Sequence, residues 1–265
     1  MNRIENIDTC IRYLMIQNKV EAELPEALPE KQLLLRALMN IWEPQALSDA
    51  FLRAQNSELQ AQLADKGTVT LSDLQAASLA NHEPASGSQL LLWQGDITRL
   101  QVDAIVNAAN SRGLGCWHPL HACIDNAIHS AAGLQLRQEC HATLRGAEIA
   151  TGEAIITRGY NLPATHVIHT VGPIIATGLP SPAQERQLAD CYRNSLSLAL
   201  ARGCHNIAFC CISTGEFRFP NRRAASIAIE TVKEQLMASH SAIQVVFNVF
   251  KETDLLIYSQ LLGAH

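Results

Sequence analysis

The sequence predicts an α/β domain, with a mostly parallel or mixed sheet covered by helices on both faces, preceded by a small helical extension. Two observations predict this fold. After residue 88, short apolar runs rich in β-branched residues, which are typical of buried strands, alternate with helical stretches. Before that point the chain has helical patterning without such runs. Alternating strands and helices are typical of a sheet with helices on both faces.

The helical extension is expected to span residues 1–80. A helix is predicted to start near Pro29, since proline is favoured at the first helical position, and its apolar stripe comprises Leu33, Leu34, Leu38 and Ile41. A second helix fits residues 44–63, and a short third one begins at Thr70. Because the stripe needs a partner surface, we expect these helices to cap the α/β domain, with target recognition as the alternative. The polar stretch 78–89 is predicted to be a linker.

The α/β domain is expected to span residues 88–265. Helices are predicted at 124–144, 183–202 and 221–239, and strands at 90–93, 103–109, 153–159, 166–172, 206–213 and 242–250. In such sheets a ligand usually binds outside the carboxyl ends of the strands. The functional loops are therefore expected directly after the strands.

Composition narrows the function classes. The chain has 265 residues, and its formal net charge of -5 argues against generic nucleic-acid binding, which needs a basic face. No stretch approaches the roughly 18 apolar residues of a membrane span, and no secretory signal is evident. We therefore expect a cytoplasmic protein with no membrane or nucleic-acid partner. In that reducing compartment, most of the eight cysteines should be buried apolar side chains.

Three loops after predicted strands have residues that suit a ligand. In WQGDITRL (93–100), Asp96 could accept a hydrogen bond from an exocyclic amine, or it could cap a turn. The amides in VNAANSRGLG (106–115) suit sugar hydroxyls, although a plain polar turn has the same composition. In CISTGEFRFPNRRAASIA (211–228), several N–H groups could meet a diphosphate, with Phe217 and Phe219 against a ring or plugging the core.

The fourth loop, GCWHPLHACIDNAIH (115–129), crowds two cysteines and three histidines into fifteen positions. The spacing C-x4-H-x-C marks three candidate metal ligands, Cys116, His121 and Cys123. In a regular helix, side chains two residues apart point about 200° apart, so a shared ion requires a loop through 123 and a helix from Ile124. The alternative is a helix that begins at Pro119 and holds no metal.

The chemistry of these ligands favours zinc if a metal is present. Thiolates and an imidazole suit Zn²⁺, and three protein ligands leave one position open, as in catalytic sites. His118 could compete as a ligand. Asp125 follows closely and could orient a water molecule or receive a proton.

Taken together, these motifs resemble the macrodomain family, whose members bind ADP-ribose. The resemblance lies, in the family's order, in QGDIT (94–98), DAIVNAANS (103–111), IDNAIH (124–129), TGEAIITRGYNLP (151–163), VIHTVGP (167–173) and STGEFRFP (213–220). It implies a three-layer α/β/α fold with a central mixed sheet over residues 88–265. GCWHPLHAC, in place of the family's glycine-rich loop, and the helical extension are similar to the zinc-containing microbial branch.

The resemblance implies a role for each matching nucleotide-binding residue. Asp96 would bond the adenine amine, with the backbone N–H of Ile97 nearby. The diphosphate and proximal ribose would be held, largely through backbone N–H groups, by Ser213, Thr214, Gly215, Glu216 and Phe217. Phe250 is a weaker candidate for stacking on adenine, with core packing as the alternative.

The resemblance also implies the reacting centre. Zinc, the expected cofactor, would be bound beside the distal ribose by Cys116, His121 and Cys123. Asn110 would contact the distal ribose, and Ile124 and Asp125 would line the same ADP-ribose pocket. Asn110 and Asp125 would also be the catalytic residues, with Asp125 assisting the water.

Members of this branch are protein-ADP-ribose hydrolases, often linked to sirtuin-like ADP-ribosyltransferases and lipoyl-carrier proteins. The implied function is zinc-dependent removal of mono-ADP-ribose from modified side chains. An ester-like link to Asp or Glu is favoured, because a carboxylate is a good leaving group. The alternatives are a reader that binds ADP-ribose without turnover, a deacetylase of O-acetyl-ADP-ribose, and an RNA-binding module, against which the acidic net charge counts.

Overall fold

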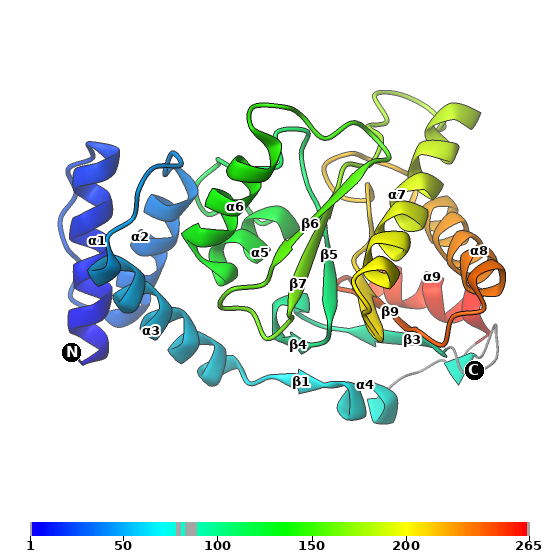
Figure 1. Ribbon diagram of the computed structural model, residues 1–265, viewed down its shortest axis with the longest axis horizontal. Helices are drawn as coiled ribbons and strands as arrows, with labels where there is room; N and C mark the ends of the chain where they lie inside the picture. The colour runs from blue at the N-terminus through cyan, green and yellow to red at the C-terminus, as the bar shows by residue number, and fades with distance from the viewer. Residues whose placement is uncertain (1, 78–80, 83–88, 264–265) are drawn as a thin grey trace.

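The structure, a computed structural model, describes residues 2–77, 81–82 and 89–263. A group of helices at the N-terminus packs beside a sheet-containing domain (Figure 1). No helix in the described part of the chain is both long and apolar enough to cross a bilayer. The cysteines are mostly inside, as expected: five of the eight are buried, namely Cys10, Cys140, Cys191, Cys204 and Cys210.

Three helices of the extension form a core of their own. They are α1 (Arg3–Asn18), α2 (Leu28–Asn40) and α3 (Asp49–Lys66). Their shared core comprises Ile7, Cys10, Ile11, Leu14, Leu35, Leu38, Met39, Trp42, Phe51, Ala54 and Leu59, joined by Leu134 of the α/β domain. The leucine-rich face of α2 therefore packs mainly on its own neighbours, not on the α/β domain as the sequence led us to expect.

Two details of the extension differ from the sequence prediction. The predicted stripe is wrong at Leu33, which is 53% exposed, because the buried side of α2 lies at Leu35, Leu38 and Met39. The helix predicted from residue 44 begins at Asp49, because the Ser48 side chain accepts a hydrogen bond from the Phe51 N–H and caps it. The short α4 (Leu71–Ala77) does follow Thr70, whose hydroxyl accepts from the Asp73 N–H.

The α/β domain has a mixed sheet, as predicted, with strand order β2-β3-β9-β8-β5-β7-β6. The inner pairs are parallel, and the two edge strands, β2 and β6, are antiparallel to their neighbours. The strands are β2 (Asn81–His82), β3 (Gln89–Gln94), β5 (Ala104–Ala108), β6 (Ala154–Arg158), β7 (His166–Thr170), β8 (Asn206–Phe209) and β9 (Gln244–Val249). Within the predicted linker, β2 pairs with the sheet, and residues 78–80 and 83–88 lie outside the described residues.

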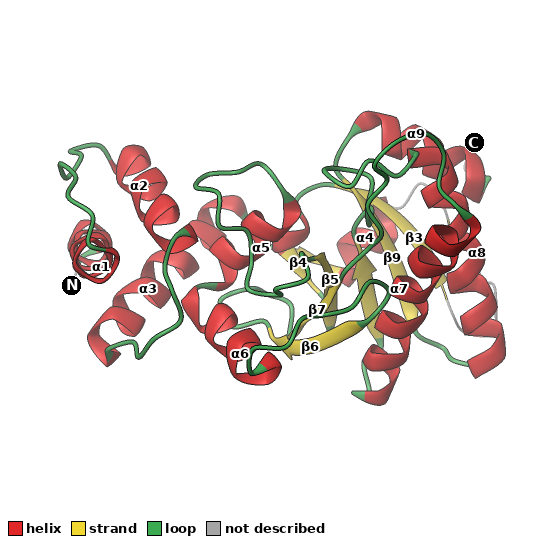
Figure 2. Cartoon of the chain, turned by 90° about the horizontal axis from the view of Figure 1, so that it is seen from above, coloured by secondary structure: helices red, strands yellow, loops and turns green. Residues whose placement is uncertain are grey.

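Helices lie on both sides of the sheet (Figure 2). They are α5 (Ile124–Ala132), α6 (Leu134–Leu144), α7 (Pro182–Ala201), α8 (Asn221–Ser239) and α9 (Glu252–Leu262). The single helix predicted over 124–144 is wrong, because Gly133 adopts a φ of +94° and separates α5 from α6. A small parallel pair, β1 (Val69–Thr70) with β4 (Leu100–Gln101), joins the extension to the α/β domain.

The topology gathers the candidate loops at one edge. Because β3, β5 and β8 belong to the parallel part of the sheet, their carboxyl ends point the same way. The segments that follow them carry the candidate site residues of 95–99, 109–125 and 210–220. The sequence expectation that the chemistry follows the strands is therefore consistent with the strand order.

Candidate active site and metal centre

Asp125 lies between two asparagine amides. Its Oδ1 accepts a hydrogen bond from Nδ2 of Asn107 at 2.8 Å, and its Oδ2 accepts one from Nδ2 of Asn110 at 3.1 Å. The carboxyl group is 5% exposed and sits in the first turn of α5, where the helix dipole favours a negative charge. Burial raises the pKa of Asp125 to about 6, although the Asn107 bond, the Arg137 charge and the Asn110 bond oppose this. This carboxyl group can therefore exchange a proton near neutral pH.

Asn107 is in turn fixed by His169 on the neighbouring strand β7. The two residues are paired in the sheet register, and Nδ2 of Asn107 lies 3.2 Å from Nδ1 of His169. The Thr157 hydroxyl donates to the Val167 carbonyl and lies 3.0 Å from Nε2 of His169, so it accepts the Nε2 proton. Burial lowers the pKa of His169 to about 4, which keeps the ring neutral. Sequence reasoning considered Asn107 only as one of the amides suited to sugar hydroxyls, and it missed the contact with His169.

His129 packs against Gly115, at the start of the loop that carries Cys116, His121 and Cys123. Its Nε2 lies 3.6 Å from Oδ1 of Asp125, and the residue is 4% exposed. A Cβ atom at Gly115 would lie 2.7 Å from Cγ of His129, and Gly115 has a φ of +82°, so only glycine fits this contact. One ring nitrogen of His129 lies within 4.8 Å of a ligand atom of Cys140 and one of His169. Because both nitrogens of His169 already have partners, we interpret this second group as hydrogen bonding at His169 and packing of the His129 ring, whose nitrogens have no hydrogen-bond partner among the described residues.

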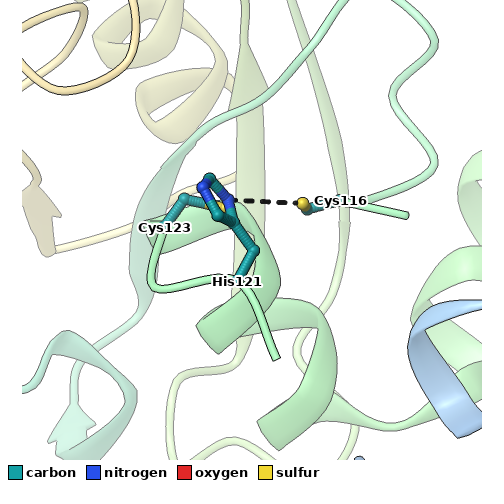
Figure 3. Close-up of side chains that lie close together, drawn as sticks. All are labelled: Cys116, His121 and Cys123. Carbon is teal, nitrogen blue, oxygen red and sulfur yellow. Dashed lines mark hydrogen bonds between the residues drawn. The ribbon is translucent and has the colours of Figure 1, made fainter. Parts of the chain in front are cut away.

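Cys116, His121 and Cys123 come together in the loop before α5 (Figure 3). Their ligand atoms lie within 4.8 Å of one another, and Sγ of Cys116 is 3.6 Å from Nδ1 of His121. Residues 116–123 are a loop and α5 starts at Ile124, so the alternative helix start at Pro119 is wrong. Cys123 itself is the N-cap of α5, and its Sγ accepts from the Asn126 N–H at 3.4 Å.

This group fits a zinc ion. Tetrahedral Zn²⁺ with bonds of ~2.3 Å to sulfur and ~2.0 Å to nitrogen would separate a thiolate from an imidazole nitrogen by about 3.5 Å, close to the 3.6 Å between Sγ of Cys116 and Nδ1 of His121. Burial raises the pKa of the Cys123 thiol to about 12, an effect that the Asn126 N–H opposes and Cys116 reinforces. A metal ion would displace that proton on binding. His118 is outside the group and offers its backbone carbonyl to His121 and Asn126 instead.

The loop after β8 reaches the metal group. Oε1 of Glu216 lies 3.7 Å from Nε2 of His121, the ring nitrogen opposite the one that faces Cys116. A carboxylate on the far nitrogen of a metal-binding histidine fixes its tautomer and makes it a stronger ligand. Sequence reasoning assigned Glu216 to the diphosphate and missed this contact, because nothing in the local spacing relates residues 121 and 216.

The same loop has the geometry of an anion site. Ser213 has a φ of +66°, and its carbonyl accepts from the Phe219 N–H at 2.9 Å, which turns the chain back on itself. The backbone N–H groups of Gly215, Glu216 and Phe217 donate to no other residue that the structure describes. Successive free N–H groups in a turn attract anions such as phosphates.

Other side chains of this loop have structural roles. The Thr214 hydroxyl donates to the Cys211 carbonyl at 3.0 Å, and Phe219 is buried, so the core-plug alternative holds for Phe219. Phe217 is half-buried and its carbonyl accepts from the Ile175 N–H. A Cβ atom at Gly172 would lie 2.0 Å from Oγ of Ser213, so this glycine allows the loop to approach β7.

Asp96 caps the short 3₁₀ turn Ile97–Arg99, as one of the two sequence interpretations expected. Its Oδ1 accepts from the Thr98 N–H at 3.0 Å, and its Oδ2 lies 3.2 Å from Nζ of Lys66 on α3. Burial opposes ionisation, but the Thr98 bonds and the Lys66 charge outweigh it and lower the pKa of Asp96. The carboxylate is thus charged at neutral pH and can accept further hydrogen bonds.

The remaining predicted nucleotide contacts lie at the same edge. Ile97 is buried and Ile124 packs half-buried against the main core. Phe250 follows β9 and is 76% exposed, so the alternative that it packs in the core is wrong. The structure thus links Asn110 with Asp125 and Glu216 with His121, while Asp96, Ile97 and Phe250 belong to the part of the edge formed by β3 and β9.

Comparison with known proteins agrees with this geometry. The Macro domain family model matches residues 106–228. The chain is 45% identical over 260 residues, 96% of each chain, to the protein-ADP-ribose hydrolase of Treponema medium. The chain belongs to the macro domain family. This macrodomain is also similar to the Oceanobacillus iheyensis macrodomain with ADP, at 39% identity and a TM-score of 0.62 over 69% of this chain and 94% of that one.

A second solved structure shares more of the chain. The Trypanosoma brucei macrodomain in complex with ADP-ribose is 32% identical, with a TM-score of 0.63, and the match covers 90% of this macrodomain and 97% of that chain. A match of that extent must include much of the helical extension. The extension is therefore a feature that this macrodomain has in common with another member of the family.

Proposed function

We propose that this macrodomain removes ADP-ribose from modified protein side chains and that zinc, bound by Cys116, His121 and Cys123, is its cofactor. The observation that carries the proposal is a buried carboxyl group, Asp125, held by two amides in the first turn after a Cys-His-Cys group. A reader of ADP-ribose would not need a carboxyl group with a pKa near neutrality. Relatives that are 43–45% identical over most of the chain are named protein-ADP-ribose hydrolases, which supports hydrolysis.

The loops suggest how ADP-ribose lies. The free N–H groups of Gly215, Glu216 and Phe217 would hold the diphosphate, and Asp96 would accept from the adenine amine. The distal ribose would then reach Asn110, whose amide already bonds Asp125, beside Ile124. The O. iheyensis and T. brucei macrodomains carry ADP and ADP-ribose respectively, which supports this class of ligand.

In the proposed mechanism, Asp125 orients the attacking water and accepts its proton. Asn107 and Asn110 keep the carboxylate in one orientation, and Asn110 also contacts the distal ribose. Water is excluded from the inner side of the carboxyl group by His129 and the buried strand β5. Zinc, when bound, would supply Lewis-acid chemistry at a ribose or water oxygen.

The resemblance to the zinc-containing branch supports a proposal for the bond that is hydrolysed and for the protein substrate. We propose an ester-like link between ADP-ribose and Asp or Glu, because a carboxylate leaves without needing a strong acid. The protein partner would be an ADP-ribosylated lipoyl-carrier protein, with a sirtuin-like ADP-ribosyltransferase as the opposing enzyme. The expected compartment is the cytoplasm.

One experiment tests the function. The purified protein is analysed for metal and then assayed for ADP-ribose release from a carrier protein modified on Asp or Glu. We expect about one zinc per chain, loss of release after chelation, and recovery with added Zn²⁺. Binding of ADP-ribose without release would identify a reader, and release of acetate from O-acetyl-ADP-ribose with no action on the modified protein would identify a deacetylase.

A further inference from the structure

Helix α2 of the extension directly contacts residues 116–123, which carry the three candidate metal ligands and are called the metal loop below. Nη2 of Arg36 donates to the His121 carbonyl at 3.3 Å, and Nε and Nη2 of Arg36 both donate to Oδ1 of Asn126, at 3.0 and 2.7 Å. One turn further along α2, Oδ1 of Asn40 accepts from the Leu120 N–H at 3.0 Å and from Nδ2 of Asn126 at 3.0 Å. Two side chains of the extension thus bind the backbone on both sides of the Leu120–His121 peptide bond.

The loop needs such support. Leu120 has a φ of +58°, a conformation that residues other than glycine rarely adopt, and its side chain is 41% exposed. Its exposed side chain does little to hold that conformation. The hydrogen bond that Leu120 donates to the buried Asn40 fixes the turn that presents His121 to Cys116.

Asn126 extends this support to the rest of the loop. It is fully buried, it donates from Nδ2 to the His118 carbonyl at 3.0 Å, and its N–H donates to Sγ of Cys123 at 3.4 Å. Its side-chain oxygen is the acceptor for Arg36. Removal of Arg36 or Asn40 would therefore take one hydrogen-bond partner from the buried Asn126 amide, which would keep the Ser130 hydroxyl and the His118 carbonyl.

Helix α2 is itself held against the α/β domain. Nη1 of the buried Arg137 on α6 donates to the carbonyls of Met39, Asn40 and Trp42, at 3.1, 3.0 and 2.7 Å. The Arg137 guanidinium also lies 4.4 Å from the ring centre of Trp117, inside the metal loop. A cation at the last carbonyls of a helix is favourable, and here it joins α2, α6 and the loop. In Figure 1, α2 lies between α1 and the α5–α6 pair.

We propose that α2 is part of the metal centre, and that Arg36 and Asn40 are positioning residues that hold residues 118–123 in their metal-binding conformation. The inference rests on the proposed zinc site. It gives the extension a role other than capping or target recognition: without α2, the ligands of one loop would lose their arrangement. Among the described residues, Arg36 and Asn40 form no hydrogen bond with the diphosphate loop, residues 213–217, so we expect their loss to weaken zinc binding more than binding of free ADP-ribose.

Zinc affinity is the direct test. Competition with a chromogenic chelator at fixed pH compares the wild type with Arg36→Ala, Asn40→Ala and the control Gln60→Ala. Nε2 of Gln60 on α3 donates to the Asn161 carbonyl at 3.0 Å. Its loss removes a hydrogen bond between the helical extension and the α/β domain that does not involve the metal loop. We expect zinc binding to weaken about 10- to 100-fold in the two α2 variants and to stay within about twofold in the control. Affinity for ADP-ribose, measured by calorimetry, should fall less than zinc affinity in the two α2 variants and should be unchanged in Gln60→Ala.

Folding is monitored by circular dichroism. If Asn40→Ala does not fold, Arg36→Lys carries the test, because it keeps the charge at a half-buried position but lacks the second donor arm. Wild-type zinc affinity in folded α2 variants would overturn the role of Arg36 and Asn40 but would leave the proposed zinc site standing. An equal loss in Gln60→Ala would also overturn it, since general destabilisation would then explain the effect. A wild type that binds no zinc would overturn the metal site itself.

Discussion

The side-chain amide of Asn110 donates to the carboxylate of Asp125 over 3.1 Å, and this contact joins the loop after β5 to the first turn of α5. It places an amide suited to ribose hydroxyls next to a carboxyl group whose pKa burial raises to about 6. If Asp125 orients and deprotonates water, Asp125→Asn and Asp125→Ala should lower kcat by about 10²–10⁴-fold. Calorimetry should show ADP-ribose affinity within a few-fold of the wild type, and wild-type turnover in folded Asp125→Ala would exclude this role.

The approach of the nucleotide loop to β7 predicts the effect of Gly172→Ala. The new Cβ atom would meet Oγ of Ser213 at 2.0 Å and displace the free N–H groups of Gly215 and Glu216. We expect ADP-ribose binding to weaken by about tenfold or more, equivalent to about 1.4 kcal/mol. The double variant Gly172→Ala/Ser213→Gly should recover part of the affinity, because glycine removes Oγ and accepts the φ of +66°, whereas Cγ2 of Ile212 stays 2.9 Å from the new Cβ atom. No recovery would mean that the contact with Ser213 is not the cause.

The contact between His129 and Gly115 predicts how much Gly115→Ala lowers the free energy of unfolding. Backbone strain at positive φ costs about 1 kcal/mol, and the clash with His129 should add a further ~1–3 kcal/mol. Gly146→Ala is the matched control, since Gly146 has a φ of +86° and nothing lies within 4 Å of its added Cβ. Urea unfolding should show the larger loss of free energy at Gly115, and equal losses at the two positions would contradict the contact.

The neutral state of His169 predicts a loss of stability in acid. Its pKa is about 4 in the fold, against 6.5 for an unshifted histidine, so the unfolded chain binds more protons between these values. Stability should therefore be complete above about pH 6.5 and fall as the pH drops toward 4. Between pH 6.5 and 5, His169 should account for about 2 kcal/mol. In His169→Gln, whose side chain can bond both Asn107 and Thr157, the free energy of unfolding in urea should fall less between about pH 6.5 and 5 than in the wild type. If the free energies of the two proteins fell in parallel with pH, His169 would not titrate in this way.

Much of the fold could be predicted from the sequence because the signals were local. The buried strands are short apolar runs, and β5, β7 and β9 lie within the predicted ranges. The start of α5 at Ile124 followed from the argument that a shared metal requires a loop through 123. The break at Gly133 was missed, since apolar spacing continues on both sides and only the φ of +94° reveals it.

The contacts that shape the site are long-range, which is why the sequence did not reveal them. Arg36 and Asn126 are 90 residues apart, and nothing in the local pattern of either relates them. The Asn107–His169 pair depends on the register of β5 with β7. The leucines of α2 indicated an apolar face correctly, but which of them faces inward depends on α1 and α3, so Leu33 was assigned to the wrong side.

The central claim is that Cys116, His121 and Cys123 bind the zinc on which hydrolysis depends. The most direct test is the zinc content of purified Cys116→Ala and His121→Ala, with ADP-ribose release from a modified carrier protein measured on the same samples. We predict that both variants fold, retain little zinc and lose release, while the wild type has about one zinc per chain. Full zinc content together with full release in either variant would contradict the account.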